Sequence, residues 1–441
     1  MLERWKVLSM RWIDLRFPTY AVLLLALLLT GCATPWHTEQ AVTATPTPQF
    51  AGGEPVLPQL QRLYHDAPPL ISSITTSDTS WPLAGHDAAN TSATIASRIT
   101  GTTHWFFQTN GPVIASPAVA GNLVLLNGGD GVLYALNKHT SVMQWRTPLG
   151  DTLVAGTAAI AGGVVYVAAQ EHGLRALRLD TGTALWSVDT KLPVRAAPLV
   201  VGSLLFVLAG ANSLLCLDAQ HGAEYWEFKS EDVLTNYWPT QGQPAVATRD
   251  GGLIFTALGA ATEFNALNVR TGRKIWEQTV DSRMVGSPVY DAQLGVVFVA
   301  TWAGHIYAMD AQTGEVRWRF ALAHTGTVGV GFATGPALAN GTVFVGDYQG
   351  HVLAVDAHTG QVRWTYQGTS AVVGTPVVRL TQQGTSDVYV AGQDGTLFAL
   401  NDETGIQEWH IYLGELRSAP ALSQDTLFIG SVGDRGLFAL V

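Results

Sequence analysis

Residues 304–318 read GHIYAMDAQTGEVRW, and residues 350–364 read GHVLAVDAHTGQVRW. Each stretch joins an apolar run to a Thr-Gly pair and reaches a tryptophan four residues after the glycine. A glycine at this place supplies the positive φ of a tight turn. Both stretches therefore predict an apolar strand, a turn and a second strand that ends on tryptophan.

The same unit recurs along the chain, and its tryptophan marks each copy. Consecutive marker tryptophans are spaced by 40, 41, 40, 50, 42, 46 and 45 residues. A glycine stands four residues before seven of them, with Ser141 as the exception, and a small residue stands ten residues before seven of them. Self-similarity of this kind predicts a repeat architecture. The eight markers are Trp105, Trp145, Trp186, Trp226, Trp276, Trp318, Trp364 and Trp409.

A second pair of β signals precedes each unit, for example residues 116–119 followed by residues 123–126. Each repeat therefore holds four short strands. Proline stands at the start of the first strand in seven repeats and Ala158 in the other, and proline in a sheet is tolerated mainly on an edge strand. Four antiparallel strands per repeat, with the first strand facing a central channel, predict the blade of a β-propeller.

The two ends of the repeat region each hold part of a blade. Residues 417–441 give three strand signals without a tryptophan strand, and residues 100–108 give a tryptophan strand without the first three. Together they complete an eighth blade. We therefore predict an all-β, eight-bladed β-propeller of four-stranded antiparallel blades over residues 81–441. Pairing of the N- and C-terminal strands in one blade would close the ring and protect its sheet edges.

The first 80 residues differ in composition from the repeats. Residues 1–31 resemble a bacterial lipoprotein signal peptide, with a basic start, a ten-residue apolar run and the sequence LTGC ending at Cys32. We expect Cys32 to be lipidated; the alternative is a secretory signal with an incidental cysteine. Residues 32–80 are rich in Thr, Pro, Gly, Ser and Gln and predict a flexible tether, or a partner-binding arm around residues 57–70.

Charge and cysteine content exclude several functions. The 441 residues carry a formal net charge of −10 and no basic run, which argues against sequence-independent nucleic-acid binding. Two cysteines exclude a disulfide scaffold, a Cys-rich zinc site and covalent haem attachment. Cys216 takes the repeat position that is alanine in the other blades, so we interpret it as a small buried residue and not as a reactive thiol.

The unit quoted first resembles the pyrroloquinoline-quinone-type repeat, whose core reads roughly Gly-x-Leu-x-Ala-Leu-Asp, then Thr-Gly, then Trp. The resemblance covers about residues 81–441, and residues 81–91 resemble the lead-in segment of many members. It implies that the marker tryptophans dock between neighbouring blades, which suits a large aromatic ring with one N–H. The alternative role for them is stacking on a ligand.

The resemblance implies one of two function classes. One is the quinoprotein dehydrogenase, with the quinone and calcium in the channel and a catalytic aspartate; the other is the non-catalytic lipoprotein propeller, represented by the scaffold subunit of the outer-membrane β-barrel assembly machine. The fold does not separate them. The chain lacks the vicinal cysteine pair that the dehydrogenases commonly place against the quinone. Its aspartates recur in register, as turn formers do, at Asp130, Asp347, Asp394, Asp434, Asp218, Asp310 and Asp356.

We therefore expect no catalytic residue, no pyrroloquinoline quinone, no calcium and no other metal. His305 and His351 occupy equivalent positions of adjacent repeats, but without a third ligand we interpret them as exposed turn residues. The protein is then a monomeric ring that serves as a binding platform or envelope assembly factor. Its expected partners are other envelope proteins and, through the acyl anchor, the lipid bilayer. A quinone-dependent oxidoreductase or a small-ligand sensor is the alternative.

The residue after the lipid cysteine bears on location. Ala33 is not the aspartate that usually retains such lipoproteins in the inner membrane. In a bacterium with two membranes we expect the protein on the outer membrane, facing the periplasm. In a bacterium with one membrane we expect it on the outer face of the plasma membrane.

One face of the ring is the predicted binding surface. Connections from a marker tryptophan to the next first strand take 11 to 13 residues, but 18 after Trp226 and Trp318. Both extensions rise on the face that also carries the hairpin turns before the third strands. Aromatic side chains and arginines dominate binding hot spots, although these loops could simply cap the channel. The candidate residues are Tyr237, Trp238, Trp302, Tyr348, Arg195, Arg283, Arg417 and His324.

Replacing Cys32 with alanine tests the anchor. We expect Cys32→Ala to abolish processing to a lipidated form and to release the protein from membranes without detergent, because no acyl chain can attach. Fractionation and mass spectrometry of the mature N-terminus measure both effects. A processed Cys32→Ala species that still requires detergent would refute the lipoprotein interpretation.

Overall fold

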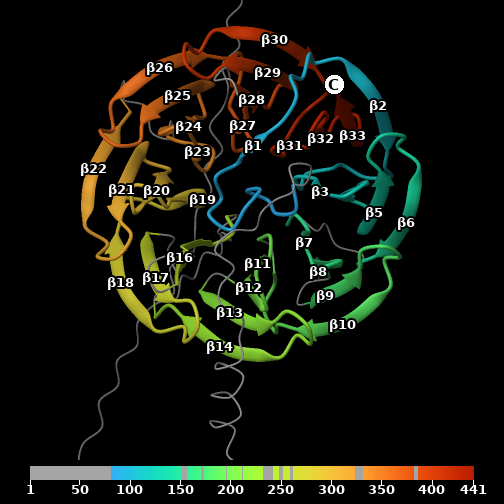
Figure 1. Ribbon diagram of the computed structural model, residues 1–441, viewed down its shortest axis with the longest axis horizontal. Helices are drawn as coiled ribbons and strands as arrows, with labels where there is room; N and C mark the ends of the chain where they lie inside the picture. The colour runs from blue at the N-terminus through green and yellow to red at the C-terminus, as the bar shows by residue number, and fades with distance from the viewer. Residues whose placement is uncertain are drawn as a thin grey trace, which may run out of the picture. The chain divides into compact units, whose positions relative to one another are not determined.

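The computed structural model describes residues 81–150, 156–169, 173–194, 196–210, 212–231, 242–247, 252–258, 262–322, 331–381 and 386–441. These residues form eight four-stranded antiparallel blades arranged as a ring, which confirms the predicted all-β propeller (Figure 1). In each blade the first strand lies innermost and the fourth outermost. Among the described residues there is no helix long and apolar enough to cross a membrane.

Seven blades consist of four consecutive strands. The first three are β3 (Ala118–Ala120), β4 (Leu123–Asn127), β5 (Val132–Asn137) and β6 (Met143–Pro148); β7 (Ala159–Ala161), β8 (Val164–Ala169), β9 (Gly173–Arg178) and β10 (Ala184–Asp189); and β11 (Leu199–Val201), β12 (Leu204–Ala209), β13 (Ser213–Asp218) and β14 (Glu224–Lys229).

The next four are β15 (Ala245–Ala247), β16 (Leu253–Leu258), β17 (Glu263–Asn268) and β18 (Lys274–Thr279); β19 (Met284–Asp291), β20 (Val296–Thr301), β21 (His305–Asp310) and β22 (Val316–Ala321); β23 (Ala337–Ala339), β24 (Thr342–Gly346), β25 (His351–Asp356) and β26 (Val362–Gln367); and β27 (Val377–Leu380), β28 (Asp387–Ala391), β29 (Thr396–Asn401) and β30 (Gln407–Tyr412).

The eighth blade joins the two ends of the repeat region, as predicted. Its inner three strands are β31 (Ala421–Leu422), β32 (Leu427–Ser431) and β33 (Gly436–Leu440), and its outer strand is β2 (Thr103–Gln108). In the β2–β33 ladder, Trp105 lies opposite Ala439. One strand was not anticipated from the sequence: β1 (Ala93–Ile95) adds to the inner edge of the blade of β27, and it pairs in parallel.

Seven marker tryptophans lie directly opposite the small residue that precedes them by ten positions, such as Ala308 for Trp318 and Cys216 for Trp226, and Trp105 lies opposite Ala439 of the closing strand. The ladder between the third and fourth strands shifts register at this pair in every blade. A small partner leaves room for the indole, and a bulge in the outermost strand makes its free edge a poor template for further pairing.

The indoles dock against the neighbouring blade, which supports their structural role. Trp318 Nε1 donates to the carbonyl of Ala357 at 3.1 Å, and Trp276 Nε1 donates to the carbonyl of Ala311 at 2.9 Å. Equivalent bonds hold five more, while Nε1 of Trp226 lacks an acceptor among the described residues. The five are Trp105 to Lys138, Trp145 to Leu179, Trp186 to Ala219, Trp364 to Asp402 and Trp409 to Ile99.

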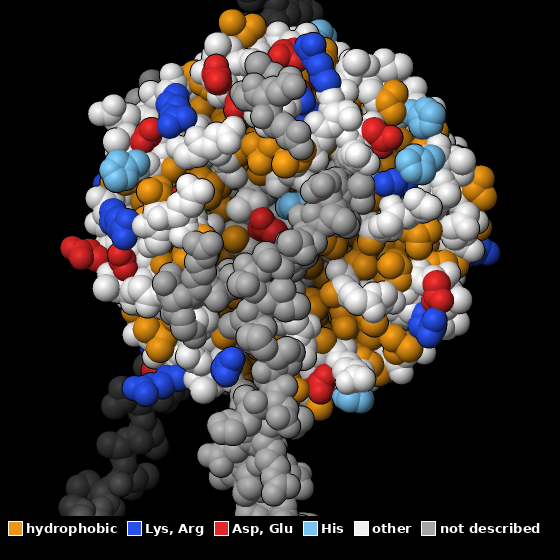
Figure 2. Space-filling model, in the orientation of Figure 1, with side chains coloured by type: hydrophobic (Ala, Val, Ile, Leu, Met, Phe, Trp, Pro, Cys, Tyr) orange, Lys and Arg blue, Asp and Glu red, His pale blue; other side chains and the backbone are white. Residues whose placement is uncertain are grey.

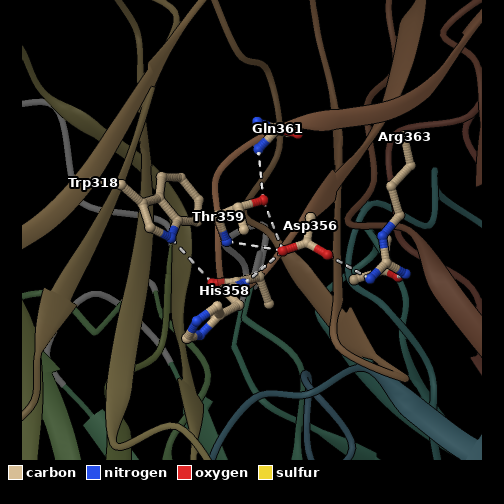
Figure 3. A network of polar contacts seen from close by, with 8 residues as sticks. Trp318, Asp356, His358, Thr359, Gln361 and Arg363 are labelled. Carbon is tan, nitrogen blue, oxygen red and sulfur yellow. Dashed lines mark hydrogen bonds and ion pairs between the residues drawn. The ribbon is translucent and has the colours of Figure 1, made fainter.

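The carbonyl that receives the indole belongs to a turn shaped by the repeated aspartate (Figure 3). Asp356 Oδ1 accepts hydrogen bonds from the backbone N–H groups of His358 at 3.1 Å and Thr359 at 2.8 Å. Arg363 donates to Oδ2 at 2.7 Å and holds the pKa of Asp356 down at about 2. The aspartate therefore fixes the backbone that presents the carbonyl of Ala357 to Trp318.

The repeated glycine serves this turn in two ways. Gly314 has a φ of +75°, which suits the turn, and a Cβ at its position would lie 2.7 Å from Cδ2 of Trp276 in the preceding blade. Gly360 contacts Trp318 in the same manner. The absence of a side chain thus lets the turn rest on the face of the indole.

Substituting this glycine separates the two effects. Gly314→Ala should lower the free energy of unfolding by about 1–2 kcal/mol for the positive φ and by about 1–3 kcal/mol more for the clash with the indole. Gly341→Ala is the matched control, because Gly341 has a φ of +67° and a Cβ added there would have no neighbour within 4 Å. Urea unfolding measures both variants. Equal losses in the two would show that indole contact contributes nothing.

Ring closure is tested by truncation. Ending the chain at Leu413 removes β31, β32 and β33 and leaves β2 without its partner strand. We expect aggregation or loss of the cooperative thermal transition, because an open ring exposes unpaired edges. Light scattering and calorimetry would report either result. A soluble truncated monomer of unchanged stability would contradict the closure.

Candidate functional site

The lead-in segment, residues 81–97, crosses the central channel and pairs with the inner strands. Six of these strands donate a backbone N–H to a lead-in carbonyl at 2.7–2.9 Å. An inner strand has one edge that no strand of its own blade covers, so these bonds satisfy groups that would otherwise face the channel. The donors and acceptors are Val119 to Trp81, Ile160 to Pro82, Val246 to Ala88, Tyr290 to Ala89, Leu338 to Thr91 and Val378 to Ser92.

Polar side chains lock the lead-in in place. Asn90 is 1% exposed and donates through Nδ2 to the carbonyls of Pro244 at 3.2 Å and Pro288 at 3.0 Å. Its Oδ1 accepts from Nε2 of Gln243. Asp87 Oδ1 accepts from the N–H groups of Ala89 and Thr91, both at 3.0 Å. The segment is thus a folded floor of the channel.

Above this floor lies a cavity of about 660 Å³. Its floor includes Gly85, Asn90 and Ser92, and its wall is built from the starts of the inner strands. Those starts carry small residues because adjacent blades touch there: a Cβ on Gly242 would lie 2.1 Å from the carbonyl oxygen of Gly286. Small side chains in a ring leave the space open, and the lead-in closes it from below, so we call the cavity the cup.

Three of the predicted residues meet on the face around the cup. The Arg283 guanidinium lies 3.9 Å from the ring centroid of Trp302, and the ring centroids of Trp302 and Tyr348 are 4.7 Å apart. Tyr348 is 40% exposed and also lines the cavity. Burial raises the pKa of its hydroxyl, against the nearby charge of Arg283. We call Arg283, Trp302 and Tyr348 the rim cluster.

Hydrogen bonds between loops hold the rim cluster on one face. The backbone N–H of Trp302 donates to the carbonyl of Arg283 at 2.9 Å, and the backbone N–H of Tyr348 donates to the carbonyl of Gly331 at 3.2 Å. These bonds join the connection that follows each outer strand to a hairpin turn before a third strand. The two kinds of loop therefore share a face, as the alternation of strands predicted.

The remaining predicted residues lie apart from this cluster or outside the described part of the chain. Arg417 lines the cavity, and its Nε donates to Glu415 at 2.8 Å. Cys32, Arg195, Tyr237, Trp238 and His324, together with the signal peptide and tether, lie outside the described residues. Their roles stay predictions.

The two histidines of the repeated turns are not fully exposed, contrary to the prediction. The side chain of His305 is 16% exposed and that of His351 is 32% exposed, because each Nδ1 pairs with a carboxylate. His351 meets Asp347 at 2.7 Å, and His305 meets Asp281. Among the described residues no three His, Cys, Asp or Glu side chains gather as a metal site would require.

The repeated aspartates and Cys216 behave as the repeat predicts. Asp347 Oδ1 accepts the N–H groups of Gln349 at 2.9 Å and His351 at 2.8 Å, and Asp394 Oδ1 accepts that of Thr396 at 3.0 Å. These carboxylates thus shape turns. Cys216 is fully buried, and burial raises the pKa of its thiol.

The cavity can be compared with the quinone of the related dehydrogenases. Pyrroloquinoline quinone is a planar tricarboxylate, and calcium takes six to eight oxygen ligands, usually with carboxylates among them. Among the described lining residues Arg417 is the single cation and Glu415 the single carboxylate, and the two are bonded to each other. This donor set does not fit the quinone and its metal.

Comparison with known proteins assigns the family. The family described as "Outer membrane protein assembly factor BamB" matches residues 87–152, 143–236, 216–328 and 303–440. The chain belongs to this family. The matched segments overlap and together cover all eight blades, so membership rests on the whole ring.

Individual relatives are distant. The outer membrane protein assembly factor BamB of Burkholderia pseudomallei is 26% identical over 234 residues, which are 49% of this chain and 59% of that protein. The crystal structure of BamB from Moraxella catarrhalis has a TM-score of 0.63 at 19% identity, over 77% of this chain and 99% of that one. The quinohemoprotein alcohol dehydrogenase from Comamonas testosteroni has a TM-score of 0.67 at 14% identity, over 82% and 80%. Both structural likenesses show the fold alone.

Sequence reasoning missed the floor of the site. Asn90 and Gln243 are 153 residues apart and meet only because the lead-in enters the channel. The sequence did offer one clue to this floor. A segment that only linked the tether to the ring would not need the ordered polar residues that the lead-in carries.

Proposed function

We propose that this chain is a membrane-anchored, extracytoplasmic lipoprotein that acts as a non-catalytic protein-binding scaffold in the assembly of outer-membrane proteins. The observation that carries the proposal is the rim cluster of Arg283, Trp302 and Tyr348, on a ring that belongs to the BamB family. Its partners are other envelope proteins. The acyl group on Cys32 would hold it to the bilayer, with residues 33–80 as the tether.

The chemistry of the rim cluster supports protein binding. Tryptophan, tyrosine and arginine are the side chains most enriched in hot spots, because they bury a large rigid area around a polar tip. Stacking on Trp302 fixes the conformation of the Arg283 side chain before a partner binds. This reduces the side-chain entropy lost on binding. On the face seen in Figure 2 the described acidic and basic side chains are interspersed around the outer edge of the ring. Recognition of a partner on such a face would depend on shape complementarity and aromatic contacts more than on a large patch of one charge sign.

Two observations support a non-catalytic role. The carboxylates of Asp347, Asp356 and Asp394 are engaged by the backbone of their own turns, so they serve the fold. The cavity lining, in its described part, presents an ion pair with no net charge where the quinone would need cations. Stoichiometric capture of the quinone with calcium, accompanied by dye reduction on an alcohol, would overturn this part of the proposal.

Replacing Trp302 together with Trp238, which the sequence predicts to lie on the same face, tests the scaffold role. Trp302→Ala combined with Trp238→Ala should reduce recovery of envelope partners by at least about tenfold, since hot-spot truncations cost about 2 kcal/mol or more. The thermal midpoint should shift little, because Trp302 is only partly buried. Affinity capture of the anchored protein, with quantitative mass spectrometry of what it retains, measures binding.

Ile406→Ala is the matched control. Ile406 is 67% exposed and lies in the turn between β29 and β30, on the opposite face of the ring. It should retain the same partners as the unmodified chain. Equal loss of folding and of capture in the double variant would assign the aromatic residues to a cap of the channel instead.

A further inference from the structure

We propose that the cup above the lead-in binds a neutral, hydroxyl-rich ligand of the saccharide class. The cup is distinct from the surrounding face that carries the proposed scaffold role, and one residue, Tyr348, belongs to both. It begins from the cavity of about 660 Å³, which falls within the range of small-molecule sites.

The lining is polar and mostly uncharged. Hydroxyl groups come from the starts of several inner strands and from the floor, and amides come from Gln243 and Gln393. The Asn90 amide is already committed to protein partners. Such a ring offers both donors and acceptors around one space, which matches a ligand whose edges carry alternating hydroxyl groups. The hydroxyl residues are Ser92, Ser116, Thr157, Ser287, Thr334, Thr375 and Ser418.

One buried acceptor in this lining has no donor. Gln243 is 1% exposed, and its Nε2 is committed to Asn90, so the orientation of the amide is set. Its Oε1 has no hydrogen-bond partner among the described residues. A buried polar atom left unpaired costs about 1–3 kcal/mol, and a hydroxyl group of a ligand would supply the missing donor.

The charges and the lip of the cup narrow the class of ligand. Glu415 and Arg417 pair at 2.8 Å and give the described lining no net charge, because no other Lys, Arg, Asp or Glu occurs in it. An anion or a cation would therefore enter without a free counter-charge, and an apolar ligand would strip water from the hydroxyl ring without replacing its hydrogen bonds. Tyr348 adds a half-exposed aromatic surface at the lip, where the C–H face of a sugar ring can pack.

Calorimetric titration tests the inference on the full lipidated chain, in a detergent without a sugar headgroup. The probes are glucose, maltose and N,N′-diacetylchitobiose, each to about 10 mM, where a site of even millimolar affinity would be largely filled. We expect at least one of them to bind at one site per ring. No detectable binding by any of the three would overturn the proposal and leave water as the partner of Gln243 Oε1.

Two variants place the binding in the cup. Thr375→Val removes a lining hydroxyl at nearly constant volume, and Gln393→Ala removes an exposed amide whose loss should not disturb folding. Each should weaken the saccharide about fivefold or more, as the loss of a hydrogen bond does. Thr313→Val, in the turn between β21 and β22 on the opposite face, should bind as the unmodified chain does.

The outcomes also separate this inference from the proposed function. Unchanged saccharide affinity in both Thr375→Val and Gln393→Ala would place any binding outside the cup and refute the site. Trp302→Ala should weaken the saccharide less than Thr375→Val does, because Trp302 is not among the described lining residues and meets the cup through its contact with Tyr348. Failure of partner capture with retained saccharide binding would therefore count against the scaffold role alone.

Discussion

The ring depends on one recurring contact, the marker indole held in the seam between two blades. A blade of four short strands buries little by itself, so neighbouring blades must supply the rest of its core. The indole does this with a large apolar area and one N–H, which needs an acceptor once it is buried. Trp318 finds that acceptor in Ala357, and the turn that offers it is shaped by Asp356 and Gly360. The repeated tryptophan, aspartate and glycine thus all form part of this one contact. The fourth repeated residue, the small one opposite the indole, leaves room for the ring.

The inner edge of the ring poses a different problem, which the lead-in solves. Seam contacts fix the outer parts of the blades but leave the inner strands with unpaired backbone groups. The lead-in supplies a carbonyl oxygen to one backbone N–H group in each of six inner strands, and it adds the parallel strand β1 beside β27. In doing so it turns the channel into a cup. The cavity remains open because the starts of the inner strands carry no large side chains. Close contacts there, such as that between Gly242 and Gly286, leave no room for them.

The same ring carries enzymes and assembly factors, so function depends on side chains added to it. In this chain Asp347, Asp356 and Asp394 shape turns, and the mouth of the cup holds one ion pair. The face around the mouth instead gathers Arg283, Trp302 and Tyr348 into a stacked cluster. The rim cluster and the cup are therefore distinct features: one is an aromatic surface, and the other is a polar hollow lined largely by different residues.

The sequence by itself determined the repeat, the number of blades and the closing blade, because these depend on local turn chemistry and on a marker that recurs every 40 to 50 residues. It also indicated that Trp302 and Tyr348 share a face, since strand direction alternates strictly within a blade. Only the tertiary structure decided which residues meet across the channel. Asn90, Gln243 and Pro288 belong to the lead-in and two different blades, and nothing in their local sequence encodes the contact. The partial burial of His305 and His351 was likewise beyond the sequence, because the pairing of His305 depends on Asp281 in a preceding loop. Contacts within a repeat follow from its period, whereas contacts across the ring follow from closure, and closure exists only once all eight blades have packed.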